Sequence, residues 1–301
     1  MKSSIRWDII NISVQSNCIT PEFQNVRPER KRNMPLKSAG RMEITTRIGC
    51  SINCVFCPQK LLVTRYCETS EGKPVTEMSL DVFKRCIDKL PLETRIDFSG
   101  MAEPWLNKDC TEMVRYAAKR GNPIAVYTTM VGMTQHDLDA LCEIPLEEFV
   151  LHIPDDKSNS HINVTPEYIA LLERAVTEKR GDEPIVTGFS CHAGLHPDIA
   201  AALPPNSKLI TEMCDRAGNL SNDAAEGANP QGDIVCIQCE ADINHNVLLP
   251  DGRVALCCMD YGMQHVLGNL LEQSWEEIHE TEEAKRVVKG MSDASLGTLS
   301  M

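Results

Sequence analysis

Strand-like and helix-like segments alternate about six times between residues 41 and 212, and this alternation constrains the fold more than any other feature. The first strand-like segment, residues 42–48, alternates in polarity and is rich in β-branched residues. Others lie at 94–98, 123–129, 149–153, 184–189 and 207–211. Such alternation predicts a parallel sheet with right-handed crossovers. Six units are too few for the usual closed eight-stranded barrel, so we expect an α/β fold with an open partial barrel or a doubly wound sheet.

Helix signals separate these strands. A side chain that can cap a helix precedes several segments whose apolar residues share one face. The capping signals are Ser79, Thr134 with Asp137, and Thr165 with Pro166. A further helix is expected over residues 108–120. In either fold, the active site lies at the carboxyl ends of the strands.

The pattern changes after residue 212. Asn, Gly, Asp and Pro dominate residues 218–233, and residues 246–256 read as a hairpin with a Pro-Asp-Gly turn. A final helix is expected over residues 272–289. The predicted organisation is an N-terminal extension at 1–40, a core at 41–212 and a small hairpin-plus-helix domain at 213–301.

The chain has 14 cysteines among 301 residues. Its N-terminal residues lack a signal-peptide pattern, so we expect a cytoplasmic protein whose clustered cysteines serve metal binding or catalysis. The net charge of −13 is opposite to that of a typical nucleic-acid binder, and no apolar run could span a membrane. We expect no nucleic-acid or membrane partner. Three cysteines in helix-like segments are expected to be packing residues: Cys86, Cys110 and Cys142.

One cysteine cluster directly follows the first strand. Cys50, Cys54 and Cys57 have the spacing C-x3-C-x2-C. Three thiolates can bind three irons of a [4Fe–4S] cluster and leave the fourth iron open for a small molecule. A closed zinc site would need a fourth protein ligand, and the histidine nearest in sequence is His136. The spacing therefore favours an iron–sulfur cluster over zinc.

This motif, with Phe56 before its last cysteine, resembles that of the radical S-adenosylmethionine (SAM) superfamily. The resemblance covers roughly residues 41–212 and implies a partial (β/α)6 barrel, with the three cysteines as ligands of a [4Fe–4S] cluster. It implies that SAM chelates the open iron. Reductive cleavage of SAM then yields a 5′-deoxyadenosyl radical, which abstracts a hydrogen atom from substrate. An electron donor such as flavodoxin or ferredoxin is also implied.

A second motif agrees with this resemblance. The segment from Ser99 to Pro104, Ser-Gly-Met-Ala-Glu-Pro, is similar to the family's Gly-Gly-Glu-Pro motif, although Ala102 replaces the second glycine. The resemblance implies that Glu103 accepts a charge-assisted hydrogen bond from the SAM amino group. His152 lies where the family binds ribose or substrate, but a core histidine explains it equally well. The implied cofactor-binding residues are Phe56, Ser99, Gly100, Glu103, Thr128 and His152.

The remaining cysteine cluster lies in residues 213–301, which we call the tail. With the hairpin and residues 267–278, it resembles the SPASM and twitch extensions of radical SAM enzymes, which hold an auxiliary iron–sulfur cluster. The implied ligands of a second [4Fe–4S] cluster are Cys214, Cys236, Cys239 and Cys257. No cysteine follows Cys258, so a domain with two auxiliary clusters is not expected. Cys258 remains an alternative to Cys257 as a ligand, and a four-cysteine zinc site remains an alternative to the cluster.

The tail is similar to twitch-type enzymes that act on sugars. We therefore predict a radical SAM enzyme that epimerises or oxidises a sugar-type substrate. Cys258 is the candidate hydrogen-atom donor and Cys191 a weaker one, and a buried structural thiol is the alternative for each. The alternative functions are a peptide-modifying maturase of the SPASM type and a non-enzymatic iron–sulfur or zinc scaffold.

Overall fold

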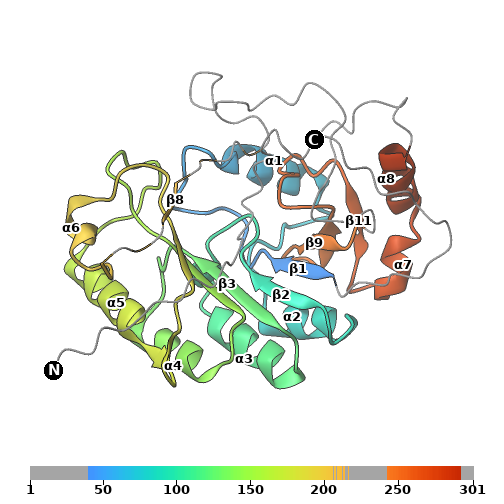
Figure 1. The fold of residues 1–301 in the computed structure, drawn as a ribbon. Helices are drawn as coiled ribbons and strands as arrows, with labels where there is room; N and C mark the ends of the chain where they lie inside the picture. The colour runs from blue at the N-terminus through green and yellow to red at the C-terminus, as the bar shows by residue number, and fades with distance from the viewer. Residues whose placement is uncertain are drawn as a thin grey trace.

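Six parallel strands form the centre of the molecule (Figure 1). The computed structural model describes residues 40–292 except 206, 208, 212, 214, 215 and 217–242, so most of the predicted extension at 1–40 lies outside the described residues. The strands are β1 (Arg41–Ile44), β2 (Arg95–Phe98), β3 (Ile124–Thr128), β4 (Glu148–His152), β7 (Gly188–Ser190) and β8 (Leu209–Ile210). All six match strand-like segments of the sequence, which confirms the predicted parallel α/β fold.

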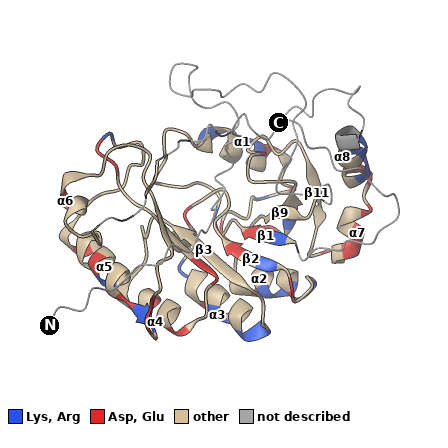
Figure 2. Ribbon diagram, viewed as in Figure 1, with Lys and Arg blue, Asp and Glu red and all other residues tan. Residues whose placement is uncertain are grey.

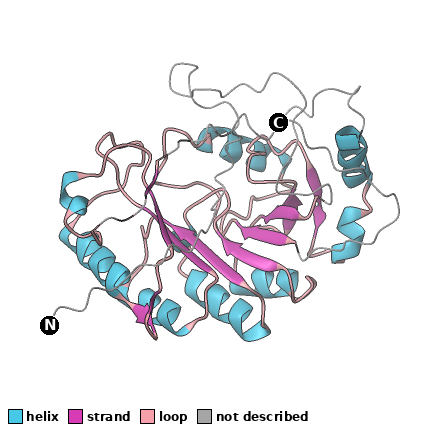
Figure 3. Ribbon diagram, viewed as in Figure 1, coloured by secondary structure: helices cyan, strands magenta, loops and turns pink. Residues whose placement is uncertain are grey.

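Helices connect these strands and cover the outer face of the sheet (Figures 1 and 3). They are α1 (Gln59–Thr69), α2 (Leu80–Ile87), the 3-10 helix η2 (Pro104–Leu106), α3 (Cys110–Arg120), α4 (Gln135–Glu143), α5 (Pro166–Thr177) and α6 (Pro197–Ala200). A small hairpin, β5 (Lys179–Arg180) and β6 (Glu183–Pro184), precedes β7. The predicted caps are confirmed: Ser79 and Thr165 accept backbone hydrogen bonds, and Thr134 and Asp137 form a complete capping box.

The two faces of the parallel strands differ in chemistry. On β1, Met42 and Ile44 are fully buried in the hydrophobic core beneath the helices. Between them, Glu43 lies on the opposite face, in register with Asp97 of β2. Figure 2 shows that both acidic and basic residues lie on β1 and β2. Since successive side chains of a strand alternate between faces, the helices cover an apolar face and leave a polar inner face.

The tail continues the same sheet. Its elements are β9 (His245–Leu248), β10 (Arg253–Ala255), β11 (Val266–Asn269), α7 (Trp275–His279) and α8 (Glu282–Ser292). The predicted hairpin is confirmed, because β9 and β10 pair in antiparallel fashion. In addition, β9 pairs in parallel with β1, which gives the sheet order β11-β10-β9-β1-β2-β3-β4-β7-β8. The tail strands therefore lie directly beside the strand that leads into the cysteine motif.

The predicted single helix over residues 272–289 is wrong, because the structure has two helices there. α7 ends at His279, and the hydroxyl of Thr281 accepts the backbone N–H of Ala284 at the start of α8. A side chain that accepts a backbone hydrogen bond in this way favours a new helix start over continuation of the preceding helix. Among the described residues, no helix is long and apolar enough to cross a membrane.

Candidate functional site

The cysteine motif occupies the loop between β1 and α1, as the sequence predicts. Gln59, the first residue of α1, holds this loop in place. Its side-chain oxygen accepts the backbone N–H of Cys50 at 3.0 Å, and its amide nitrogen donates to the carbonyl of Met101 at 2.7 Å. The buried Gln59 therefore joins the cysteine loop to the loop that follows β2. Sequence reasoning missed this residue, because a single glutamine at a helix start carries no motif.

Two of the three thiols interact with each other. Contact with the Cys54 thiol, and then the charge of Arg216, lowers the pKa of Cys57 to about 5 despite its burial. The same contact raises the pKa of Cys54, whose sulfur lies 3.4 Å from the hydroxyl of Ser160. Burial raises the pKa of Cys50, while the backbone N–H groups of Glu103 and Ile52 oppose this shift. The loop thus contains one thiol, that of Cys57, which ionises readily, and the thiolate is the form of cysteine that binds metals.

The donor set fits a polynuclear cluster. Within the part of the chain that the structure describes, no three thiol, imidazole or carboxylate groups are close enough to share a single metal ion. In a [4Fe–4S] cluster each thiolate binds a different iron, so the three ligands need not converge on one point. Three cysteines on one loop match the number of cysteine ligands in a [4Fe–4S] cluster whose fourth iron has none.

Glu103 lies beside this loop and is almost completely buried. Its carboxylate accepts hydrogen bonds from the hydroxyl of Thr128 at 2.5 Å and from the hydroxyl and backbone N–H of Thr129, each at 2.7 Å. The backbone N–H of Trp105 donates a fourth bond. Burial raises the pKa of Glu103, and these donors oppose the shift. The structure thus joins two predicted residues, Glu103 and Thr128, by a direct hydrogen bond.

The turn before Glu103 depends on a glycine. Gly100 has a φ of +74°, and a Cβ atom there would lie 2.5 Å from the side-chain oxygen of Thr45. That oxygen accepts the backbone N–H of Met101, so the two loops are in close contact. The predicted residue Ser99 donates its hydroxyl to Glu43 at 3.2 Å, on the polar inner face of the sheet. Gly100 therefore permits the approach of the loops that follow β1 and β2.

Aromatic rings extend the site toward β4 and β7. The ring centroid of Phe56 lies 4.7 Å from that of His192, and His192 lies 6.4 Å from His152. Burial, with the nearby charges of His192 and Arg216, lowers the pKa of His152 to about 3. His152 is therefore neutral at physiological pH. The structure brings the predicted Phe56 and His152 together through His192, which sequence reasoning missed because it lies in no motif.

The tail also reaches the cysteine loop. The hydroxyl of Tyr261 lies 3.6 Å from the sulfur of Cys57, and Arg216 lies 3.7 Å from the same sulfur. Neither contact is signalled in the sequence, since Tyr261 is separated from Cys57 by 204 positions.

The other predicted cysteines have different surroundings. Cys258 is buried and hydrogen-bonded to Glu43, and Cys257 beside it is half-buried. Cys191 is fully buried in the apolar core, where its sulfur lies within 3.8 Å of three backbone carbonyls. Cys214, Cys236 and Cys239 lie outside the described residues. The cysteines expected to pack do so: Cys86 and Cys110 are in the core, and Cys142 packs against it.

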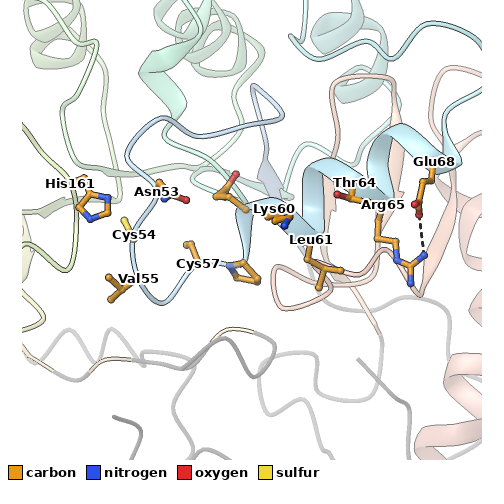
Figure 4. Close-up of a pocket in the computed structure, with 12 residues that line it drawn as sticks. Asn53, Cys54, Val55, Cys57, Lys60, Leu61, Thr64, Arg65, Glu68 and His161 are labelled. Atoms are coloured by element: carbon orange, nitrogen blue, oxygen red, sulfur yellow. Dashed lines mark hydrogen bonds and ion pairs between the residues drawn. The ribbon is translucent and has the colours of Figure 1, made fainter. Parts of the chain in front are cut away.

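A hollow of about 750 Å³ opens between the cysteine loop and α1 (Figure 4). Cys54 and Cys57 line it together with the cationic side chains of Lys60 and Arg65. Val55, which is 42% exposed, also lines it. Two of the three motif cysteines thus line this hollow.

The C-terminal region is similar to a known domain family. Residues 239–297 match the model of the SPASM family, described as an iron–sulfur cluster-binding domain. A tungsten-containing aldehyde ferredoxin oxidoreductase cofactor-modifying protein from Pyrococcus furiosus is 29% identical over 109 residues, or 35% of this chain. The match spans only 28% of that relative's length.

Solved structures share the fold across most of the chain. The crystal structure of BtrN in complex with AdoMet and 2-DOIA gives a TM-score of 0.56 at 19% identity, covering 86% of this chain and 89% of BtrN. Streptococcus suis SuiB bound to precursor peptide SuiA gives a TM-score of 0.50 at 13% identity, covering 83% of this chain and 66% of SuiB. These likenesses confirm the α/β fold, and the family match identifies residues 239–297 as a SPASM-like region.

Proposed function

We propose that this protein is a radical SAM enzyme that binds a [4Fe–4S] cluster through Cys50, Cys54 and Cys57. The observation that carries this proposal is the junction of two loops at the carboxyl ends of β1 and β2, where the backbone N–H of Glu103 faces the Cys50 thiol. Active sites of parallel α/β folds lie at these strand ends. When bound, the cluster and SAM supply a radical that abstracts hydrogen.

The protein's part in this chemistry is to orient SAM. Glu103 would accept a hydrogen bond from the SAM amino group, and Thr128 and Thr129 hold its carboxylate in one position. Preorganisation of this kind reduces the cost of binding. Gly100 keeps the loop close to β1, and Phe56 and His152 supply a neutral aromatic wall.

The test is anaerobic reconstitution with iron and sulfide, followed by SAM and dithionite. We expect the wild-type protein to form 5′-deoxyadenosine. The Cys50/Cys54/Cys57→Ala variant should form none, while a Cys86→Ala variant, altered only in the core, should behave as wild type.

Metal content tests the second centre in the same samples. We propose that Cys214, Cys236, Cys239 and Cys257 hold an auxiliary [4Fe–4S] cluster, so the triple variant should retain iron and sulfide. Zinc in place of that iron would support a four-cysteine zinc site instead. A well-formed, reducible wild-type cluster that yields no 5′-deoxyadenosine would support a non-enzymatic scaffold.

We further infer a sugar-type substrate that is epimerised, with Cys258 as the hydrogen-atom donor. This is supported by the contact of Cys258 with Glu43 on the polar inner face, whereas Cys191 packs in the apolar core. The Cys258 S–H bond breaks as a C–H bond forms on the substrate radical. The sulfur radical then takes up one proton, and one electron from an external iron–sulfur or flavin donor.

Deuterium distinguishes the possible reactions. In D2O, with a panel of monosaccharides, aminosugars and cyclitols, epimerisation should place one solvent deuterium in the product. The Cys258→Ala variant should consume SAM without forming the epimer, and Cys86→Ala serves as its control. A product that has lost two hydrogens would indicate oxidation instead. Turnover only with peptides would indicate a maturase.

We propose that the external electron donor, such as a flavodoxin or ferredoxin, approaches the hollow lined by Cys54 and Cys57. Support comes from the cationic side chain of Lys60 in its lining, since cations attract an acidic partner, whereas Arg65 is already paired with Glu68 at 3.0 Å. Exchanging Lys60 for Glu should slow reduction of the cluster by such a donor protein and leave reduction by dithionite unchanged.

A further inference from the structure

Two tail residues contact the sulfur of one proposed cluster ligand. Arg216 donates to the hydroxyl oxygen of Tyr261 at 2.9 Å, which leaves the Tyr261 O–H free to point at the Cys57 sulfur 3.6 Å away. The guanidinium of Arg216 itself lies 3.7 Å from that sulfur. Cys57 therefore faces a hydroxyl donor and a full positive charge, both supplied by the tail.

We propose that Tyr261 and Arg216 raise the reduction potential of the cluster bound at Cys57, an inference that rests on the proposed function. Hydrogen bonds to ligating sulfurs and nearby charges are among the factors that set the potential of an iron–sulfur cluster. One-electron reduction adds a negative charge to the cluster. A donor and a cation beside a ligand sulfur stabilise the reduced state more than the oxidised state.

The surroundings strengthen this effect. Tyr261 is fully buried in a hydrophobic cluster with Leu62, Tyr66 and Met101. Charges and hydrogen bonds act more strongly in such low-dielectric surroundings than in water. The ring of Phe56 also lies under the Arg216 guanidinium, 5.8 Å from its central carbon, and helps to hold the cation in place. The same elements that pack the tail against the core thus fix the two donors.

The experiment is a redox titration of the full reconstituted protein, followed by electron paramagnetic resonance. The signal that changes when SAM is added identifies the cluster of interest. The test variants are Tyr261→Phe and Arg216→Gln. The matched control is Tyr66→Phe, which removes a hydroxyl from the same hydrophobic cluster. The Tyr66 hydroxyl donates to the carbonyl of Val75 at 2.6 Å and not to a thiol.

We expect Tyr261→Phe to lower the one-electron reduction constant about tenfold, a shift of about 59 mV, with Arg216→Gln lowering it at least as much. Tyr66→Phe should leave the potential unchanged. Potentials of both test variants equal to wild type would overturn the inference while leaving the proposed function intact. Should Tyr261→Phe fail to fold, the difference in reduction potential between Arg216→Gln and Tyr66→Phe tests the inference. Failure of wild type to form a cluster or cleave SAM would instead overturn the proposed function.

Discussion

Individual buried charges in this protein are held by dense hydrogen bonding. Glu103 accepts four hydrogen bonds, and Arg95 forms a buried pair with Asp97 at 2.7 Å and a second pair with Glu148 at 2.8 Å. A buried charge is tolerated only when such partners replace water. Removing one partner leaves another buried polar group without a hydrogen bond, so substitutions of these residues should lower stability.

Glu103→Gln should affect both stability and SAM binding. The neutral amide keeps the size of the side chain but has only one acceptor oxygen. Either the Thr128 and Trp105 donors or both Thr129 donors would therefore face an NH2 group. We expect a loss of about 1–3 kcal/mol in the free energy of unfolding and roughly tenfold weaker SAM binding. Urea unfolding and calorimetric titration measure these quantities. Glu112→Gln, at an exposed position of α3, is the control, and equal effects of the two substitutions would contradict the proposed role of Glu103.

The Glu43–His245 ion pair, at 3.0 Å, should make stability depend on pH. Burial alone would raise the pKa of Glu43 and lower that of His245, but the close contact of the two side chains and their opposite charges outweigh it. The pKa of Glu43 is consequently lowered from 4.5 and that of His245 raised from 6.5. The Glu43 contribution is lost as pH falls through its folded-state pKa, and the His245 contribution is lost as pH rises through its own.

The coupling between these side chains should therefore be largest between pH 4.5 and pH 6.5, the unfolded-state pKa values of the two groups. It should decline as the pH rises above this range and the histidine loses its proton. A double-mutant cycle with Glu43→Gln and His245→Gln, unfolded in urea at about pH 5.5 and about pH 8.5, measures it. Equal coupling at the two pH values would show that the pair is not ionised as described.

At the scale of elements, local chemistry decides where the chain turns. The tail hairpin turns at Gly252, which has a φ of +84°. A Cβ atom there would lie 2.6 Å from the side-chain oxygen of Asn269 and 2.6 Å from Cγ of Leu271. The turn thus needs glycine for its backbone conformation and for the close packing of the chain around it.

Comparison with Gly72 separates these two needs. Gly72 has a φ of +76° but no atom within 4 Å of the position of a Cβ. Gly72→Ala should cost about 1–2 kcal/mol of stability from conformation alone. Gly252→Ala should cost about 1–3 kcal/mol more, because the methyl group also overpacks. Chemical denaturation of both variants measures the difference, and equal losses would argue against close packing at the turn.

At the scale of the whole molecule, the tail and the core share one sheet and one hydrophobic core. Trp105, beside the Glu103 loop, and Trp275, in α7, belong to the same cluster of buried residues. The pairing of β9 with β1 joins the two parts through backbone hydrogen bonds. We therefore expect them to unfold together.

Variants that retain only Trp105 or only Trp275 test this expectation. Their fluorescence transitions in urea should have the same midpoint, as cooperative two-state unfolding requires. An earlier transition at Trp275 would show that the tail unfolds as an independent unit. Far-ultraviolet circular dichroism on the same samples supplies a measure of helix loss independent of fluorescence.

The sequence by itself determined the features that depend on neighbouring residues. The alternation of strands and helices, the caps at Ser79 and Thr134, and the turn at Gly252 all follow from local periodicity and backbone chemistry. The C-x3-C-x2-C spacing likewise needs only one loop. Its place at the end of β1 follows from the strand that precedes it.

Only the tertiary structure decided which distant segments meet at that loop. The pairing of β9 with β1 brings Tyr261 to Cys57, and the order of parallel strands brings His192 to Phe56. The division of the final helix at Thr281 also depends on such a contact, since its hydroxyl donates to Leu267 of β11. These contacts arise from strand order and packing between segments far apart in the chain, and local spacing carries no information about them.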